Sequence, residues 1–221
     1  MSKPLVLKSI VEYDAFRKKL AGSIGFVPTM GALHPGHASL LNQSAAENDF
    51  TVLSIFVNPT QFNDPKDLEN YPRTFEADLA VAAESRVAAI FYPDYKEIFS
   101  DNYRYVITEK SFSQILCGAS RPGHFDGVLS VVMKLLNIVK PSKAYFGEKD
   151  FQQLRLIEDM AKAFFMSLEI RRGKTLRETS GLAMSSRNTR LSAGGRDQAA
   201  LIYKTISTAN SATDAKNILN E

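Results

Sequence analysis

The chain has 221 residues, of which 44% are hydrophobic and 23% charged, and its net charge is +3. A chain of this length can bury a core in one large domain, and the composition excludes a disordered or fibrous protein. Because the basic residues are interleaved with acids, an extended nucleic-acid surface is also excluded, and any anionic partners are small molecules.

Three features indicate where the protein works. The lone cysteine, Cys117, cannot form an internal disulfide, which favours a reducing compartment. The N-terminal segment interrupts its apolar residues with Lys8 and Glu12 and lacks a small-residue cleavage site, so it is a poor signal peptide. No apolar stretch reaches the length of a membrane span. We therefore expect a cytoplasmic protein without a membrane partner.

Short apolar runs bounded by turn residues recur along the chain and predict buried strands. They cover residues 23–27, 51–57, 87–92 and 144–146, with a weaker run at 168–172. Val, Ile and Phe dominate these runs, and such side chains favour the pleated, buried surface of a sheet. The sequence therefore predicts a sheet whose strands are separated by longer connections.

Helices are predicted between these strands. The clearest lies in the stretch 127–142, where apolar residues recur at intervals of three and four and Pro141 marks the end. Those residues are Val128, Val131, Val132, Leu135, Leu136 and Val139. A second helix is expected after Asp150, with Leu154, Ile157, Met160, Ala161 and Phe164 on one face.

Strands alternating with helices predict an α/β protein with a Rossmann-like, doubly wound, mainly parallel sheet. We assign this domain to residues 1–183. After Asn188 the character changes, since 193–221 has a helical pattern and no further strand. Residues 184–221 are therefore expected to form a linker and the start of a small, truncated C-terminal domain. Ligands of such sheets bind beyond the carboxyl ends of the strands.

The first strong candidate for a site follows the strand at 23–27. Residues 28–31 are expected to make a tight turn, and a helix is expected to begin near Gly36, where free N–H groups can hold phosphate. His34 and His37 lie three apart near the first helical turn and can donate hydrogen bonds to phosphate oxygens. The alternative is that one histidine caps the helix and the other lies on the surface. Two of the chain's three histidines fall here, which favours a function.

Polar side chains also follow the other predicted strands. Asn58 and Gln61 come after the strand at 51–57, and their amides can read hydroxyl and carboxylate groups. Lys149 follows the strand at 144–146, where a mobile positive charge can stabilise a phosphate in the transition state. The stretches 118–128 and 184–188 add further basic and hydroxyl side chains. Each stretch alone is also compatible with an ordinary surface loop.

The spacing H-x-G-H after a strand resembles the nucleotidyltransferase superfamily, which includes the class I aminoacyl-tRNA synthetases. Taken together, the stretches closely resemble one family, the pantothenate synthetases or pantoate–β-alanine ligases. The residues that carry the resemblance read VPTMGALHPGH, SIFVNPTQF, YPRT, GASRPGHFDGV, KLLNIVKPSKAYFGEKDFQQL and GLAMSSRN. They lie in one collinear order between Val27 and Asn188, so the set is far more specific than any single motif.

The resemblance implies a reaction in two steps. ATP and pantoate first give pantoyl adenylate and pyrophosphate, and the amine of β-alanine then attacks the activated carbonyl and releases AMP. The resemblance also implies Mg²⁺ bound mainly through the ATP phosphates, and a homodimer. Such adenylation depends chiefly on positioning and on stabilisation of charge.

The resemblance further implies roles for individual residues. The catalytic residues would be His37, the family's assigned proton donor, together with His34, Lys149 and Arg187. ATP would contact Met30, Gly31, Ala32, Leu33, His34, Pro35, Gly36, His37, Gly147, Glu148, Lys149, Asp150, Leu176, Met184, Ser185, Ser186 and Arg187. Pantoate and β-alanine would contact Gln61, Gln153, Asn58, Tyr71 and Arg121. Asp78 would be the protein's contribution to the metal, through water.

Two departures from the family pattern stand out. Thr60 occupies a position that is commonly methionine, which makes the expected pantoate pocket slightly smaller and more polar. The chain also ends soon after the family's C-terminal lid domain would begin, which puts lid closure in doubt. Two other functions stay open, namely a nucleotidyltransferase that stops at a stable product and a domain that only binds its ligands.

Overall fold

The structure, a computed structural model, describes residues 3–220. Six parallel strands form one sheet in the order β1-β4-β3-β2-β5-β6. The strands are β1 (Leu5–Leu7), β2 (Ile24–Thr29), β3 (Phe50–Ile55), β4 (Ala89–Phe91), β5 (Lys143–Gly147) and β6 (Glu169–Gly173). The expected parallel, doubly wound α/β sheet is thus confirmed.

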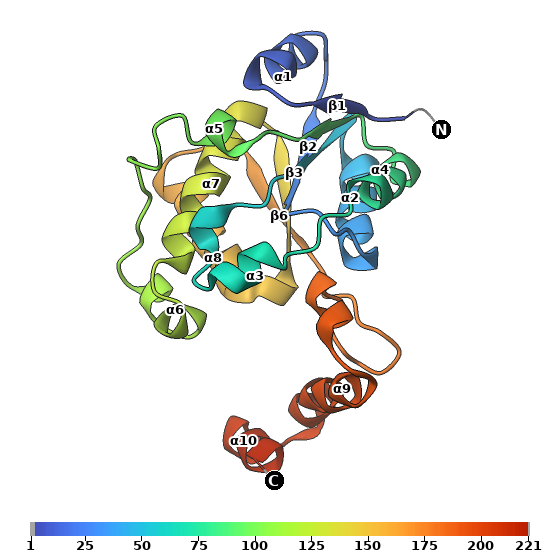
Figure 1. Cartoon of the computed structure of the whole chain (residues 1–221), viewed down its shortest axis with the longest axis vertical. Helices are drawn as coiled ribbons and strands as arrows, with labels where there is room; N and C mark the ends of the chain where they lie inside the picture. Colours follow the sequence, from blue (N-terminus) through green and yellow to red (C-terminus); the bar gives the residue numbers. More distant parts are fainter. Residues whose placement is uncertain (1–2, 221) are drawn as a thin grey trace.

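Helices cover both faces of the sheet (Figure 1). One face packs against α1 (Ile10–Arg17), α7 (His124–Val139) and α8 (Phe151–Ala163), and the other against α2 (Pro35–Glu47) and α4 (Phe75–Glu84). Successive strand residues point to opposite faces, so Phe26 and Val52 join the core under α7, whereas Val27 and Leu53 join the core under α2. This two-sided burial explains why the strands are continuous apolar runs.

The predicted elements differ from the structure in four places. β1 was not predicted, because it is short and partly exposed at the sheet edge. The turn expected at 28–31 begins later, since Pro28 and Thr29 still belong to β2. The helix predicted from residue 127 begins at His124. Phe164, predicted on the buried face of its helix, lies just beyond α8 and is 53% exposed.

Smaller elements connect the strands on the side of their carboxyl ends. They include the single-turn 3₁₀ helices η1 (Pro59–Gln61) and η3 (Glu148–Asp150) and the short helices α3 (Pro65–Glu69), α5 (Tyr95–Ile98) and α6 (Cys117–Ser120). A further 3₁₀ helix, η2 (Phe112–Gln114), precedes α6. Parallel strands end at one edge of the sheet, so these connections gather there.

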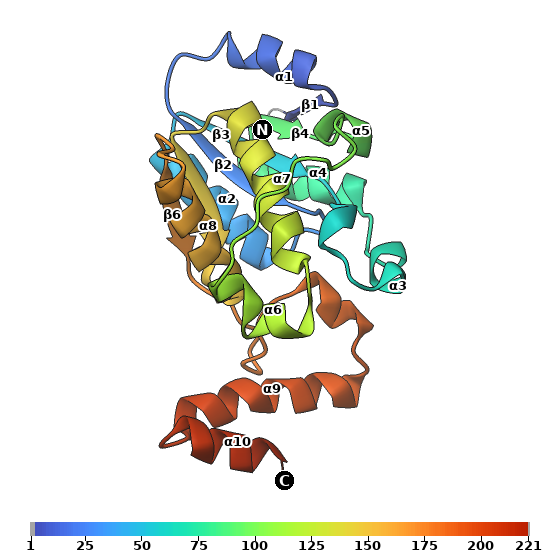
Figure 2. The ribbon, with the colours of Figure 1, turned by 90° about the vertical axis from the view of Figure 1, so that its left-hand side faces the viewer.

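The C-terminal part of the chain leaves β6 and extends away from the sheet (Figures 1 and 2). It contains η4 (Ser186–Arg190), α9 (Ala193–Thr208) and α10 (Ala212–Asn220). A β-bridge between Arg177 and Ala183 closes the loop before η4, and the Arg177 guanidinium lies 3.6 Å from the centre of the Tyr203 ring. No helix in residues 3–220 is long and apolar enough to cross a membrane.

Candidate functional site

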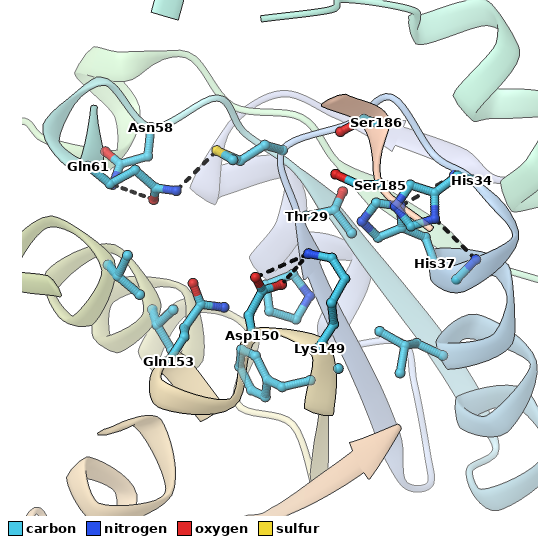
Figure 3. Close-up of a pocket in the computed structure, with 18 of the residues that line it drawn as sticks. Thr29, His34, His37, Asn58, Gln61, Lys149, Asp150, Gln153, Ser185 and Ser186 are labelled. Carbon is cyan, nitrogen blue, oxygen red and sulfur yellow. Dashed lines mark hydrogen bonds and ion pairs between the residues drawn. The ribbon is translucent and has the colours of Figure 1, made fainter. Parts of the chain in front are cut away.

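A deep pocket opens beyond the carboxyl ends of β2, β3 and β5. Side chains from separate loops converge on it, as Figure 3 shows. Its polar lining includes Thr29, His34, His37, Asn58, Gln61, Tyr71, Arg121, His124, Lys149, Asp150, Gln153, Lys174, Thr175, Ser185, Ser186 and Arg187. In a parallel sheet ligands bind at this edge, because the loops that follow the strands and the N-termini of the next helices meet there.

The two histidines of the first motif occupy the start of α2. His34 is the N-cap, and its Nδ1 accepts the Gly36 N–H at 3.1 Å. The Nδ1 of His37 accepts the His34 N–H at 3.3 Å, so the pair forms a reciprocal cap. The alternative that one histidine caps the helix is therefore true of His34, which also lines the pocket.

This capping fixes the tautomer of both imidazoles. A neutral histidine that accepts through Nδ1 carries its hydrogen on Nε2, which can donate to a ligand. Burial lowers the pKa of both rings, and the neighbouring Lys149 charge acts in the same direction. The neighbouring His34 lowers the pKa of His37 further, to about 3. Both side chains are thus neutral hydrogen-bond donors at neutral pH.

Glycines at two positions make this turn possible. A Cβ on Gly36 would lie 2.8 Å from Cε1 of His34, so only glycine lets that imidazole fold back over the helix end. Gly31 has a φ of +81°, a conformation that other residues rarely adopt. The shape of the loop itself therefore requires both glycines.

The side chain of Gln61 is held in one orientation. Asn58 is 1% exposed, and its Nδ2 donates to the Gly127 carbonyl and to Oε1 of Gln61, both at 3.1 Å. Oδ1 of Asn58 accepts the hydroxyl of Thr60 at 2.9 Å. Because Oε1 of Gln61 is occupied, its Nε2 is the end that faces the pocket, where it lies 3.1 Å from the Met30 sulfur.

The backbone of Gln61 is held from the other side. His124, which is 8% exposed, lies with Nδ1 at 2.8 Å from the Gln61 carbonyl, and its Nδ1–H donates to that oxygen. Its Nε2 then accepts from the Arg121 guanidinium at 3.2 Å. Arg121 also donates to the Gln61 carbonyl at 3.3 Å. Gln61 is therefore fixed at both its side chain and its main chain.

Lys149, Asp150 and Gln153 form the opposite wall, at the start of α8. The Lys149 ammonium lies 3.0 Å from Asp150, and both groups are partly exposed in the pocket. Asp150 is the only carboxylate among the residues that line it, within the part of the chain that the structure describes. This wall therefore offers one mobile positive charge and one acidic group to a ligand.

The last wall comes from the C-terminal segment. Ser185 caps η4 through its hydroxyl, and the Ser186 hydroxyl lies 3.5 Å from that of Tyr71. Arg187 pairs with Asp67 at 2.9 Å, and its guanidinium lies 5.5 Å from the centre of the Tyr71 ring. Tyr71 itself is 5% exposed, so it supports this segment from beneath.

Most of the predicted site residues line this one pocket. All five proposed pantoate or β-alanine contacts do so, as do the four proposed catalytic residues. Five of the proposed ATP contacts do not line it, namely Gly31, Ala32, Leu33, Pro35 and Glu148. The first three lie in the loop between β2 and α2.

Asp78, proposed as a metal contact, has a different place. It is 2% exposed, and its carboxylate accepts the N–H groups of Ala32 and Leu33 at 3.0 and 2.7 Å and the Thr74 hydroxyl at 3.2 Å. It lines a neighbouring hollow and not the pocket with the histidines. This geometry does not favour the metal assignment, because the carboxylate is used to hold the loop in place.

Some pocket residues were not predicted. Thr29 ends β2, and Lys174 and Thr175 directly follow β6. The rule that ligands bind beyond strand ends could have found these three. The apolar wall is formed by Val128, Val131 and Val132 of α7 together with Phe56. Periodicity assigned these valines only to the core.

Comparison with known proteins gives a consistent result. Residues 5–221 match the sequence profile of a family described as pantoate-beta-alanine ligase. The pantothenate synthetase of Bdellovibrio bacteriovorus is 59% identical over 210 residues, which cover 95% of this chain and 84% of that protein. A pantothenate synthetase of Legionella pneumophila is 52% identical over 194 residues, covering 87% and 77%.

Solved structures agree with the sequence comparison. The pantoate-beta-alanine ligase from Francisella tularensis, complexed with beta-gamma ATP and beta-alanine, superimposes with a TM-score of 0.93 at 41% identity, covering 98% of this chain and 85% of that one. The pantothenate synthetase from Thermus thermophilus gives 0.87 at 39% identity, covering 92% and 73%. The chain belongs to the pantoate-beta-alanine ligase family.

Proposed function

We propose that the protein condenses pantoate with β-alanine at the expense of ATP, forming pantothenate, AMP and pyrophosphate through a pantoyl adenylate. The observation that carries this proposal is the division of one pocket into two chemical halves. Side chains that can bind phosphate lie on the side of α2, η3 and η4, and the oriented amide of Gln61 and the apolar side chains of α7 lie on the other.

The phosphate half suits the first step. A pantoate carboxylate attacks the α-phosphorus of ATP, and pyrophosphate leaves with increasing negative charge. The Nε2–H groups of His34 and His37 and the Lys149 ammonium can stabilise that charge without moving far. Ser185, Ser186 and Arg187 close the same half from the C-terminal side. We expect Lys149 to leave Asp150 for the phosphates.

The pKa of His37 bears on its role. With its pKa lowered to about 3, the ring is neutral at neutral pH, so it donates a hydrogen bond through Nε2–H and lacks the acidic proton of an imidazolium. An anionic phosphate nearby would raise that pKa by favouring the charged form. We therefore assign His37 to charge stabilisation, which requires no proton transfer to be essential.

The other half suits pantoate. Nε2 of Gln61 offers donors to carboxylate or hydroxyl oxygens, and Gln153 provides a second amide across the pocket. Val128, Val131 and Val132 supply an apolar surface for the branched methyl groups of pantoate. Asn58 contributes through Gln61, since it is buried and its own donors are already used.

The second step needs a β-alanine amine next to the activated carbonyl. Adenylation makes this attack feasible, because AMP is a far better leaving group than oxide. Arg121, which lines the pocket beside Gln61, is the guanidinium best placed to attract the β-alanine carboxylate. As the C–N bond forms, the bond between the carbonyl carbon and the phosphate oxygen breaks and AMP departs, and the proton lost by the nitrogen passes to solvent.

We propose Mg²⁺ as the accompanying ion. Within residues 3–220 no cluster of three His, Cys, Asp or Glu side chains could hold a metal by itself. This agrees with Mg²⁺, which usually keeps waters and binds substrate phosphates with one or two carboxylates. Asp150 is the carboxylate available in the pocket. The ion would neutralise phosphate charge when bound.

The domain boundary near residue 183, the homodimer and the cytoplasmic location stay predictions. Limited proteolysis would test the first, because a flexible boundary is cut before folded domains. Sedimentation of the purified protein would test the second. Cell fractionation would test the third.

The decisive experiment measures products with ATP, Mg²⁺, pantoate and β-alanine. We expect pantothenate and AMP in equal amounts, with AMP formation dependent on both pantoate and β-alanine. A stable nucleotidyl product that accumulates regardless of β-alanine would indicate the transferase alternative. Binding of ATP and pantoate without AMP formation would indicate a domain that only binds its ligands.

A further inference from the structure

The polar side-chain contacts between the C-terminal wall of the pocket and the sheet domain are confined to one short segment. Among the described residues, every side-chain hydrogen bond or ion pair from 184–190 to residues before 174 reaches the segment 67–71. That segment comprises the end of α3 and the residues that follow it. The two parts are more than a hundred positions apart in sequence, so only the fold brings them together.

One carboxylate is the centre of this attachment. Asp67 accepts from Arg187 at 2.9 Å through one oxygen and from Arg190 at 2.7 Å through the other. Arg190 also donates to the Asn70 carbonyl at 2.7 Å. The two hydrogen-bonded guanidinium groups lower the pKa of Asp67, Arg187 most strongly, so the carboxylate is ionised at neutral pH. We call Asp67, Arg187 and Arg190 the clasp.

The geometry leaves Arg187 able to act on a ligand. Only its Nη2 contacts Asp67, and its Nε and Nη1 have no hydrogen-bond partner in residues 3–220. A guanidinium has five N–H donors in a fixed plane, so one edge can bind the carboxylate while another faces the pocket. Arg190, in contrast, does not line the pocket.

An isolated exposed ion pair contributes little, but these contacts share one partly buried acceptor. The Asp67 side chain is 25% exposed, and it joins two arginines in a network with a backbone carbonyl. Such networks and charge-assisted bonds are stronger than single surface pairs. Tyr71 packs beneath Arg187 and limits its movement.

We propose that Asp67 is a positioning residue, which docks the 185–190 segment onto α3 and holds Arg187 facing the ATP phosphates. The inference rests on the ATP-binding role of Arg187 proposed above. A clasp also links the half of the pocket that binds phosphate to the segment carrying Tyr71 on the pantoate side. Ordering of one half would then assist the other.

The first test is steady-state kinetics of Asp67→Asn, with Glu69→Gln as the matched control. Glu69 lies on the same helix, is exposed, and its side chain makes no hydrogen bond or ion pair within the described residues. We expect KM for ATP to rise about tenfold in Asp67→Asn and kcat to fall less, as for loss of a shared charge-assisted contact. Glu69→Gln should match wild type.

Arg190→Ala separates the clasp from direct binding. Because Arg190 does not line the pocket, its loss should raise KM for ATP only through the docking of Arg187, about threefold. The double variant Asp67→Asn/Arg190→Ala should resemble Asp67→Asn alone, since both substitutions disrupt the same set of contacts. An additive effect would contradict the clasp.

A second readout does not depend on turnover. Trypsin cleaves after arginine, so undocking should speed cleavage after Arg187 and Arg190, which mass spectrometry identifies. We expect cleavage at least about fivefold faster in Asp67→Asn, because an undocked segment opens more often and trypsin cleaves the open form. The cleavage rate of Glu69→Gln should not change. Unchanged cleavage and unchanged KM in Asp67→Asn would overturn the proposal.

The outcomes also distinguish the clasp from the proposed function. If the wild type forms no pantothenate but Asp67→Asn still exposes the segment, the proposed function fails and the docking stands without its catalytic consequence. If KM for ATP falls in Asp67→Asn, Asp67 restrains Arg187 and competes with ATP, and the positioning role is wrong. A midpoint of thermal unfolding in Asp67→Asn that equals the wild-type value excludes a general loss of fold.

Discussion

The rings of His34 and His37 lie 4.0 Å apart, and each is anchored through Nδ1 to a backbone N–H at the start of α2. These two hydrogen bonds therefore both end the loop after β2 and leave two Nε2–H donors for the pocket. The same geometry makes each histidine both a cap of α2 and part of the site. Because the cap uses Nδ1 and leaves Nε2 for a ligand, a substitution that replaces only one of these nitrogens separates the two roles.

The first prediction concerns His37→Asn. An asparagine oxygen can take the place of Nδ1 as acceptor for the His34 N–H, but nothing replaces the Nε2–H. We expect stability within about 0.5 kcal/mol of wild type, and adenylation about 100-fold slower, as for loss of one oxyanion donor. Thermal unfolding and pyrophosphate release measure the two effects.

His37→Gln is the matched comparison. Its longer side chain places an amide near the position of Nε2, but no atom takes the place of Nδ1, so the helix cap is lost. It should retain more activity than His37→Asn and be less stable. Equal activity in both variants would show that the Nε2–H is not the group that matters.

The second prediction concerns pH. Burial lowers the pKa of His34, His37 and His124, so the unfolded chain binds more protons than the folded one below the ordinary histidine value of 6.5. The stability that the neutral rings contribute is complete above pH 6.5 and is lost as the pH falls toward about 3. Urea unfolding across this range should show the free energy of unfolding decreasing with acidity.

The variant His37→Asn provides the control for the pH effect. Its unfolding free energy should depend less on pH between 6.5 and 3 than that of wild type. Parallel curves for the two proteins would mean that His37 titrates normally in the fold.

The third prediction concerns Asp78→Asn. The substitution replaces one carboxylate oxygen that accepts from the loop of Ala32 and Leu33 with an amide donor. We expect a loss of about 1–3 kcal/mol in unfolding free energy, as for an unsatisfied buried group. The concentration of Mg²⁺ that gives half-maximal activity should stay unchanged, whereas a rise of about tenfold would support the metal role.

The fourth prediction concerns Asn58→Asp. A carboxylate oxygen in place of Nδ2 would repel Oε1 of Gln61, so the Gln61 amide would turn and present an acceptor to the pocket. KM for pantoate should rise about tenfold or more, the scale of a lost hydrogen bond to a charged group, whereas KM for ATP should change little. An equal rise in both constants would indicate general damage to the pocket.

Much of the architecture could be predicted because it depends on local patterns. Apolar runs identified five of the six strands, and intervals of three and four residues identified α7 and α8. β1 was missed, since three residues at a sheet edge carry too weak a pattern. Phe164 was misplaced because the periodicity continues past the point at which the helix ends.

The sequence by itself determined the candidate residues for the chemistry, through motifs that follow strand ends in the order of the chain. The tertiary structure decided how they work together. It turned Asp78 toward the loop, set the orientation of Gln61 through Asn58, and brought Arg187 to Asp67. The physical reason is that hydrogen-bond partners distant in sequence meet only when the parallel strands end at one edge.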